Sequence, residues 1–265
     1  MSNENIEIRQ RIIASSRQVI VKAGTRLLTS REAIGTLVKS IDLLRRHDKR
    51  VLLVTSGAVG MGMKALDLER RPKELAQVQA LAAIGQCRLM AIYEEECRKY
   101  NIRTAQLLLT AADLRSRDLN VMNCINALWD NDVLPIVNEN DSVSVAELKF
   151  GDNDSLAGML GALTNSELTI ILTTEQGLRK SENGELKERI SVVGELGKEH
   201  LDMALGTDNA ELSVGGMSSK LKAASIVTRA GQYLWIADGR RTNIVESILN
   251  AEDVGTVFLP RKHKI

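Results

Sequence analysis

Short apolar runs alternate along this chain with longer stretches whose apolar residues recur at helical spacing, and this alternation constrains the fold most. The runs typical of strands are Gln18–Lys22, Val51–Thr55, Thr104–Leu109, Leu134–Val137, Leu168–Thr173, Tyr233–Ala237 and Gly255–Leu259. The segments with helical periodicity include Glu32–Arg46, Glu74–Tyr100, Ser116–Asn131, Asp154–Leu163 and Ser218–Ala230. Continuously apolar strands are buried on both faces, and intervening helices impose parallel crossovers. The sequence therefore predicts an α/β fold, a three-layer α/β/α sandwich around an open, mainly parallel sheet.

The chain is long enough to bury a large core, and nothing in it suggests a linker. It has 265 residues, 44% of them hydrophobic, and only three prolines. We expect one domain over residues 1–265, in which residues 1–16 form an N-terminal extension with a helix at Ile6–Ser15. The polar region Arg179–Gly206 lacks periodicity and is predicted to form loops, with a turn at Ser181-Glu182-Asn183-Gly184.

Charge and composition exclude several classes of partner. The 35 basic and 34 acidic residues leave a net charge of +1, which argues against a nucleic-acid partner. No run approaches the roughly 18 consecutive apolar residues of a membrane span, and the N-terminus is polar and acidic, unlike a secretory signal. We expect a cytoplasmic protein without a membrane partner.

The cysteines and histidines are few and scattered. They are Cys87, Cys97, Cys124, His47, His200 and His263. Because none is paired or clustered in a metal-binding pattern, we expect reduced, structural thiols and no metal ligands among these six residues.

Two clusters of carboxylates and amides border a predicted strand and a predicted helix. Asn138, Glu139, Asn140 and Asp141 follow the Leu134–Val137 run, and Asp152, Asn153 and Asp154 precede the Leu156–Leu163 run. One Asp or Asn would suffice to cap the helix. Unpaired buried carboxylates are costly, so the surplus is expected to meet cations. Parallel sheets bind ligands at the carboxyl ends of their strands, which makes these clusters a candidate binding site.

Three glycine-bearing turns are candidate cradles for a phosphate or carboxylate. They are Lys22-Ala23-Gly24-Thr25, Thr55-Ser56-Gly57-Ala58 and Gly215-Gly216-Met217-Ser218-Ser219-Lys220. Glycine allows close approach to an anion, although turn geometry and capping alone also favour these residues. Lys220 opens a helix, where a cation is unfavourable unless an anion binds nearby. Lys22 ends a buried strand and could likewise bind an anion; the alternative is that its ammonium group is simply solvated at the strand end.

Eight motifs occur in the order and spacing of a known family. They are VIVKAGT (19–25), VTSGAVGMG (54–62), AAIGQ (82–86), LLLTAADL (107–114), PIVNENDSV (135–143), KFGDND (149–154), LTTEQGL (172–178) and VGGMSSKLKAA (214–224). From about Gln18 to Phe258 the chain resembles the amino acid kinase family, and within it the glutamate 5-kinases. The succession of NEND, FGDND and GGMxxK is what distinguishes the glutamate 5-kinases from the other kinases of this family.

The resemblance implies ATP- and Mg²⁺-dependent phosphorylation of the side-chain carboxylate of L-glutamate to L-glutamyl 5-phosphate, the first step of proline biosynthesis. Phosphoryl transfer requires mainly alignment and neutralisation of negative charge, which lysines, Mg²⁺ and glycine-loop amides supply. The substrate carboxylate is already ionised, so no general base is required.

The resemblance also implies roles for individual residues. The implied catalytic residues are Lys22, Lys220, Asp152 and Asp154. The implied glutamate-binding residues are Ser56, Asp141, Asn153, Gly24, Thr25, Gly57 and Asn138. The implied nucleotide-binding residues are Lys22, Thr173, Thr174, Val214, Gly215, Gly216, Met217, Ser218, Ser219 and Lys220. Mg²⁺ is expected through the ATP phosphates rather than through protein ligands. Residues 17–165 would form the amino-acid half and residues 166–260 the nucleotide half.

For partners, the family implies a homodimer or homotetramer, L-proline as a candidate feedback inhibitor, and the downstream glutamate-5-semialdehyde dehydrogenase. Many members carry a C-terminal PUA domain, which we expect this chain to lack.

The departures from the family pattern leave alternatives open. Arg26 replaces a small serine, Thr174 an aspartate and Arg179 a tyrosine, while Ser213-Val214 replaces Gly-Thr. A catalytically weakened homologue that senses glutamate or proline, or a kinase of a related small carboxylate, would also fit. A dinucleotide dehydrogenase fits less well because Gly60-Met61-Gly62 lacks the third glycine of GxGxxG.

Overall fold

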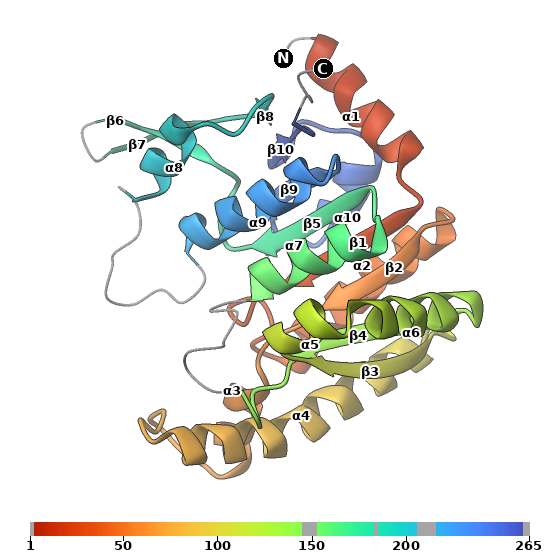
Figure 1. The fold of residues 1–265 in the computed structure, drawn as a ribbon, viewed down its shortest axis with the longest axis vertical. Helices are drawn as coiled ribbons and strands as arrows, with labels where there is room; N and C mark the ends of the chain where they lie inside the picture. The colour runs from red at the N-terminus through yellow and green to blue at the C-terminus, as the bar shows by residue number, and fades with distance from the viewer. Residues whose placement is uncertain (1–2, 145–152, 183–184, 206–215, 262–265) are drawn as a thin grey trace.

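A single eight-stranded sheet runs through the molecule in the order β3-β4-β2-β1-β5-β9-β10-β8 (Figure 1). The computed structural model describes residues 3–144, 153–182, 185–205 and 216–261. The strands are β1 (Gln18–Ala23), β2 (Arg50–Val54), β3 (Arg103–Leu109), β4 (Val133–Glu139), β5 (Leu168–Thr173), β8 (Val192–Val193), β9 (Tyr233–Asp238) and β10 (Thr256–Phe258). All neighbouring pairs from β3 to β9 are parallel, and β10 runs antiparallel to β9. The predicted α/β fold with a mainly parallel sheet is confirmed.

Helices cover both faces of the sheet (Figure 1). They are α1 (Asn3–Ser15), α2 (Arg31–Arg46), α3 (Ala58–Ala65), α4 (Leu75–Arg98), α5 (Ala111–Ser116), α6 (Asp118–Asp130), α7 (Asn153–Thr164), α8 (Lys198–Leu205), α9 (Met217–Arg229) and α10 (Ile244–Leu249). Val19 and Val21 of β1 pack with α1, α2, α4 and α10, whereas Ile20 packs with α6 and α7. Because side chains alternate along a strand, Lys22 lies on the same face as Ile20, beneath α7.

The prediction of loops across Arg179–Gly206 was wrong. This region contains the antiparallel hairpin β6 (Arg179–Glu182) and β7 (Glu185–Arg189), the short strand β8 and the helix α8. Lys180, Lys187 and Glu188 are exposed, so the ribbon lacks the apolar run that marks a buried strand. Residues 183 and 184 of the predicted turn lie outside the described residues. The short helices α3, α5 and α10 were not predicted either.

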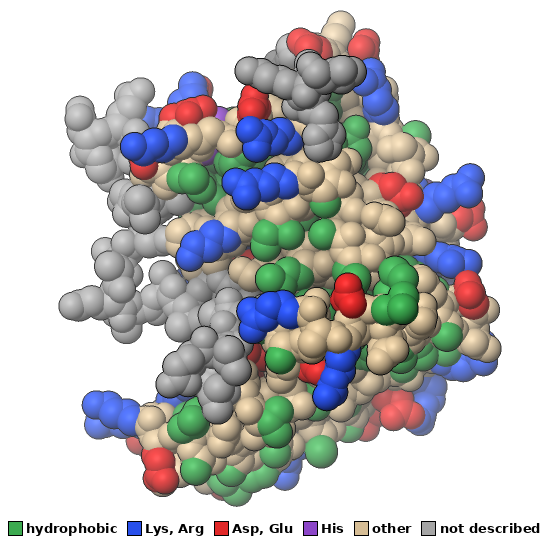
Figure 2. All heavy atoms as spheres, in the orientation of Figure 1, with side chains coloured by type: hydrophobic (Ala, Val, Ile, Leu, Met, Phe, Trp, Pro, Cys, Tyr) green, Lys and Arg blue, Asp and Glu red, His purple; other side chains and the backbone are tan. Residues whose placement is uncertain are grey.

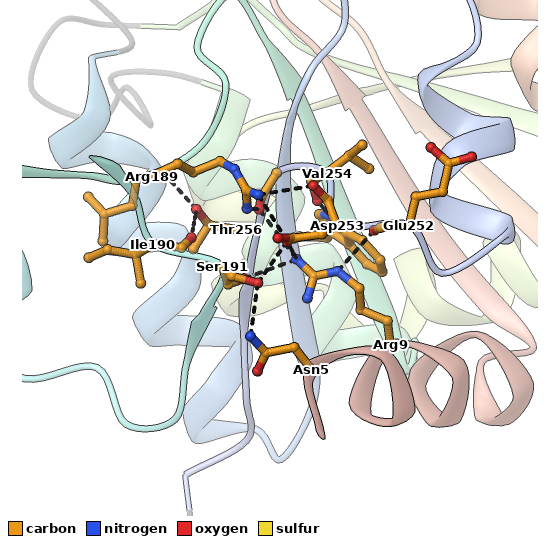
Figure 3. Close-up of polar contacts among 12 residues, drawn as sticks. Asn5, Arg9, Arg189, Ile190, Ser191, Glu252, Asp253, Val254 and Thr256 are labelled. Atoms are coloured by element: carbon orange, nitrogen blue, oxygen red, sulfur yellow. Dashed lines mark hydrogen bonds and ion pairs between the residues drawn. The ribbon is translucent and has the colours of Figure 1, made fainter. Parts of the chain in front are cut away.

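Helix α1, which includes the helix predicted at Ile6–Ser15, is fastened to the sheet by a buried arginine. Arg9 is fully buried and lies over the ring of Trp235, 5.1 Å from its centroid. Its Nη2 donates to Asp253 Oδ1 at 3.0 Å and to the Ser191 carbonyl at 3.1 Å, and its Nε donates to the Glu252 carbonyl at 3.1 Å (Figure 3). A single side chain thus connects α1 to β9 and to the segments preceding β8 and β10.

Asp253 remains ionised in this cluster. Burial alone would raise the pKa of Asp253, but the Ser191 hydroxyl, Arg189 and Arg9 together hold that pKa below its ordinary value. Ser191 Oγ donates to Asp253 at 2.7 Å, and Arg189 Nη2 lies 2.9 Å from the same carboxylate. The carboxylate therefore has partners other than Arg9.

Helix α4 is the one described helix that is long and apolar enough to cross a membrane by length and composition, with a best window of mean hydropathy 1.3. In this structure it packs against α2, α3 and β3. It buries Val78, Leu81, Leu89 and Tyr93 there, as a core helix of an α/β sandwich does.

Candidate active site

Four neighbouring parallel strands end together at one edge of the sheet. Lys22 of β1 pairs with Val54 of β2 and with Ile171 of β5, and Val54 pairs with Val137 of β4. The loops that follow β4, β2, β1 and β5 therefore open side by side. Three of the sequence motifs meet at this edge, which is where parallel sheets bind ligands.

The centre of the site is a buried carboxylate held by two lysines. Asp154, in the first turn of α7, is fully buried. Its Oδ1 lies 2.5 Å from Lys22 Nζ, at the end of β1, and its Oδ2 lies 3.0 Å from Lys220 Nζ, in α9. Ser219 Oγ donates to the same Oδ2 at 2.9 Å. The structure thus brings together residues from three predicted motifs that lie far apart in the sequence.

Among the described side chains that meet here, two are basic and one is acidic. Burial alone would raise the pKa of Asp154, but Lys22 and Lys220 hold it below its ordinary value, so the carboxylate is ionised. The side chains of Lys22 and Lys220 are 7% and 5% exposed. Two ammonium groups share one carboxylate in a sheltered place. Ammonium groups at such a place suit a bound anion such as a phosphoryl group.

Helices α7 and α9 approach closely enough to bring Asp154 and Lys220 into contact. A side-chain carbon at Gly158 of α7 would lie 3.2 Å from the Cα of Ala223 in α9, tighter than ordinary van der Waals contact. Small residues at the crossing therefore allow the two helix backbones to approach, and both helices begin at the site.

A second group of side chains lies beside the lysine pair, on the β2 and β4 side. Asn153 Nδ2 lies 2.5 Å from the Thr55 carbonyl, 2.9 Å from Ser56 Oγ and 2.8 Å from Asn138 Oδ1. Gly57, directly after Ser56, has a φ of +106°, a left-handed conformation that favours glycine, and is the N-cap of α3. Because Asn153 and Asp154 are adjacent at the start of α7, this group and the lysine pair form one continuous site.

The other predicted site residues lie around these two groups. Gly24 adjoins Lys22, since a side-chain carbon there would lie 3.4 Å from Lys22 Nζ. Thr25 is exposed, and Asp141 is half-buried in the turn after β4. Thr173, which is buried, ends β5 and pairs with Asp238 of β9. The predicted residues Asp152, Val214 and Gly215 lie outside the described residues.

Two buried residues at the site were not predicted from the sequence. Gln86 of α4 accepts a hydrogen bond from Asn138 Nδ2 at 2.9 Å, and Tyr93 of the same helix shares a 2.7 Å hydrogen bond with Thr55 Oγ1. Burial raises the pKa of Tyr93, so its hydroxyl stays protonated. A polar residue on the apolar stripe of α4, between Gly85 and Leu89, is the signal that could have identified Gln86.

The chain is similar to known proteins over nearly all of its length. The model of the amino acid kinase family matches residues 17–238. The glutamate 5-kinase of Desulfotalea psychrophila is 40% identical over 270 residues, which cover 98% of this chain and 72% of that protein. The glutamate 5-kinase of Thermoanaerobacter sp. X514 is 41% identical over 258 residues, which cover 94% and 69% of the two chains.

Among solved structures, the carbamate kinase from Giardia lamblia bound to AMP-PNP superimposes with a TM-score of 0.64 at 15% identity. The match covers 94% of this chain and all of that one, and at this identity it supports the fold alone. The extent of the sequence match and the shared fold lead to one conclusion: this chain belongs to the amino acid kinase family.

Proposed function

We propose that this protein transfers the γ-phosphoryl group of ATP to the side-chain carboxylate of L-glutamate, forming L-glutamyl 5-phosphate in the first step of proline biosynthesis. The observation that carries the proposal is the buried Asp154 carboxylate between Lys22 and Lys220, at the junction of two groups of binding loops. Relatives at 40% and 41% identity that are named glutamate 5-kinase support the choice of substrate.

The reaction needs alignment and charge neutralisation rather than a nucleophilic side chain. An oxygen of the glutamate side-chain carboxylate forms a bond to the γ-phosphorus, and the bond from that phosphorus to the β–γ bridging oxygen breaks. The bond's electron pair leaves with ADP. Lys22 and Lys220 would neutralise negative charge on the transferring group, while Asp154 keeps both ammonium groups in place. No proton is transferred, since the attacking carboxylate is already ionised.

The glutamate end of the site would lie over β2, β1 and β4. The N-cap residue of α3, Gly57, has no side chain that could bond the first amide groups of the helix, so these amides suit the α-carboxylate of the substrate. Asp141 would bind the substrate ammonium together with the carbonyl oxygen of Asn153. Gly24 and Thr25 beside Lys22, and Ser56 beside Asn153, would complete the pocket.

The nucleotide would lie over β5 and the start of α9. The described residues that would contact it are Thr173 and Thr174, the N-cap Gly216, and the first turn of α9 from Met217 to Lys220. Residues 17–165 would thus form the amino-acid half and residues 166–260 the nucleotide half.

Mg²⁺ would arrive on the phosphates of ATP, where it would add positive charge opposite the lysines. Both oxygens of Asp154 already bind a lysine, which fits a metal held mainly by phosphate oxygens.

L-Proline shares the ammonium and α-carboxylate groups of glutamate, so we include it in the proposal as an inhibitor that occupies the glutamate half. We also propose that the protein is a cytoplasmic homodimer or homotetramer. It would pass its acyl phosphate to glutamate-5-semialdehyde dehydrogenase.

Trapping the product tests the function directly. Purified protein is incubated with L-glutamate, MgATP and hydroxylamine, and γ-glutamyl hydroxamate is measured. Hydroxamate is expected with glutamate, and the Lys22→Met variant is expected to form it about 100-fold more slowly or less. Hydroxamate from L-aspartate instead of glutamate would indicate a kinase of another small carboxylate. Hydroxamate with another nucleoside triphosphate instead of ATP would indicate a changed base preference. Glutamate or proline binding without hydroxamate from any nucleotide would instead indicate a sensing protein.

A further inference from the structure

A row of side-chain amides leads from helix α4 into the glutamate half of the site. Gln86 Nε2 donates to Gln106 Oε1 at 3.1 Å, and Gln86 Oε1 accepts from Asn138 Nδ2 at 2.9 Å. Asn138 Oδ1 in turn accepts from Asn153 Nδ2 at 2.8 Å. Gln86, Asn138 and Asn153 are 7%, 2% and 9% exposed, so water competes little with these bonds. We call these four residues the amide relay.

Backbone groups determine the direction of the relay. The backbone N–H of Glu139 donates to the Asn138 side chain at 3.0 Å, so the atom that it meets must be the oxygen. The backbone carbonyl of Thr55 accepts from the Asn153 side chain, so the atom that it meets must be the nitrogen. Gln86 must therefore present its oxygen to Asn138, since only the Asn138 nitrogen remains to be paired.

This direction decides what Asn153 offers to a ligand. Its nitrogen is directed at Thr55, Ser56 and Asn138, inside the protein. Within the described part of the chain, no side chain or backbone donor is hydrogen-bonded to Asn153 Oδ1. A carbonyl oxygen presented in this way selects a ligand with a hydrogen-bond donor, such as an ammonium group.

Helix α4 holds the relay at a fixed position relative to the substrate loop. A side-chain carbon at Gly85 would overlap the carbonyl oxygen of Ala58, so the α4 backbone rests directly on the first residue of α3. Eight residues further along α4, the Tyr93 hydroxyl shares a 2.7 Å hydrogen bond with Thr55 Oγ1. Gln86 follows Gly85 directly and lies between the contacts made by Gly85 and Tyr93. Its position is therefore fixed relative to the loop that carries Ser56 and Gly57.

We propose that Gln86 is a positioning residue for amino-acid recognition: through Asn138 it orients Asn153, so that Asn153 Oδ1 accepts a hydrogen bond from the ammonium group of the substrate. The proposal rests on the proposed function, since it assumes that an amino acid binds beside Asn153. It also gives Asn138 an indirect role, because both ends of its side-chain amide are bonded within the protein.

The test separates orientation from simple packing. Gln86→Met keeps the length of the side chain but cannot accept from Asn138, whereas Gln86→Glu keeps the acceptor and lets Gln106 rotate to donate. Gln86→Met is expected to raise the KM for glutamate about tenfold or more, and to leave the KM for ATP within about twofold, because one oriented hydrogen bond to a charged group is lost. Gln86→Glu is expected to restore most of the affinity. Gln77→Met, an exposed glutamine on the same helix, is the matched control and should behave as wild type.

Coupling to Asn138 and binding without turnover complete the test. The effects of Gln86→Met and Asn138→Leu on the glutamate KM should be strongly non-additive, because both changes interrupt the same relay. The rise in melting temperature caused by glutamate without nucleotide should shrink in Gln86→Met and return in Gln86→Glu.

The two proposals fail in different ways. Wild-type activity with an unchanged glutamate KM in Gln86→Met would overturn the role of Gln86 alone. Equal losses in Gln86→Met and Gln86→Glu would also overturn it, because a packing defect would then explain both. A wild-type protein that forms no hydroxamate would overturn the proposed function and this inference with it.

Discussion

Lys22 Nζ lies 2.5 Å from Asp154 Oδ1, and the exposed fractions of the two side chains are 7% and 0%. The residues lie 132 positions apart in the sequence and meet because α7 crosses above the end of β1. Lys220 binds the other oxygen of Asp154, so three elements meet at one carboxylate.

Removing either lysine should slow phosphoryl transfer more than it weakens glutamate binding. Lys22→Met and Lys220→Met are each expected to lower kcat by about 100-fold or more, the usual cost of losing a group that neutralises transition-state charge. Hydroxamate formation measures turnover, and the glutamate-induced rise in melting temperature measures binding. Lys222→Met, an exposed lysine on α9, is the control. Loss of glutamate binding in parallel with turnover would contradict the assigned role.

Replacing Asp154 should destabilise the fold in a pH-dependent way. Asp154→Asn removes the one charged carboxylate that both buried ammonium groups contact among the described residues, and a loss of about 3–5 kcal/mol in the free energy of unfolding is expected at neutral pH. The folded-state pKa of Asp154 lies below the ordinary 3.8. Its ionised form therefore stabilises the fold above that ordinary pKa, and this contribution is lost as the pH falls through the folded-state pKa.

Urea unfolding of the wild type and Asp154→Asn from neutral pH downward measures this difference. The gap between the two should be constant at higher pH and narrow only below about pH 4. If the difference in unfolding free energy between wild type and Asp154→Asn does not change with pH, the charge of the Asp154 carboxylate is not what stabilises its contacts with the two lysines.

The N-terminal helix should depend on Arg9. Arg9→Met is expected to lower the free energy of unfolding by about 2 kcal/mol, because it removes the hydrogen bonds from Arg9 to Ser191, Glu252 and Asp253 and the contact with Trp235. Asp253 keeps Arg189 and Ser191, which limits the loss. Thermal unfolding compared with Arg11→Met, an exposed arginine on the same helix, measures the effect. Equal stability of the two variants would show that the buried contacts of Arg9 add nothing to the free energy of unfolding.

A single methyl group at Gly85 should disturb the substrate loop. In Gly85→Ala the new carbon would overlap the Ala58 carbonyl oxygen, so α3 must shift, at an expected cost of about 1–3 kcal/mol and a higher KM for glutamate. Gly60→Ala is the matched control on α3, since nothing lies within 4 Å of the added carbon. That substitution should stabilise the protein by about 0.5–1 kcal/mol through helix propensity. Denaturant unfolding and glutamate kinetics of both variants measure the contrast.

The parts of the fold that could be predicted are those with local signals. The strands of the central sheet were recognisable because both faces are buried, which makes their sequences continuously apolar. The polar hairpin of β6 and β7 was missed because its exposed ribbon has no such pattern. Helix α3 was missed because it has only eight residues, of which two are glycines and two are methionines, and so short a segment carries little periodic signal.

Lys22, Asn153, Asp154 and Lys220 stood out in the sequence by residue type and by their place at the ends of elements. Their convergence on one carboxylate depends on strand order and on the crossing of α7 and α9 at Gly158. Gln86 has no such local signal beyond being polar on an apolar stripe, and its partner Asn138 lies 52 residues away.

The sequence by itself determined the class of fold, the edge of the sheet where a ligand would bind and most of the side chains available there, because periodicity and element ends are local properties. Only the tertiary structure decided which of those groups touch: that Lys22 and Lys220 share Asp154, that Asn153 is directed by Gln86 through Asn138, and that Arg9 fastens α1. The physical reason is that a buried charge or amide is stable only with a matched partner, and the partners come from distant elements that meet only in the folded chain.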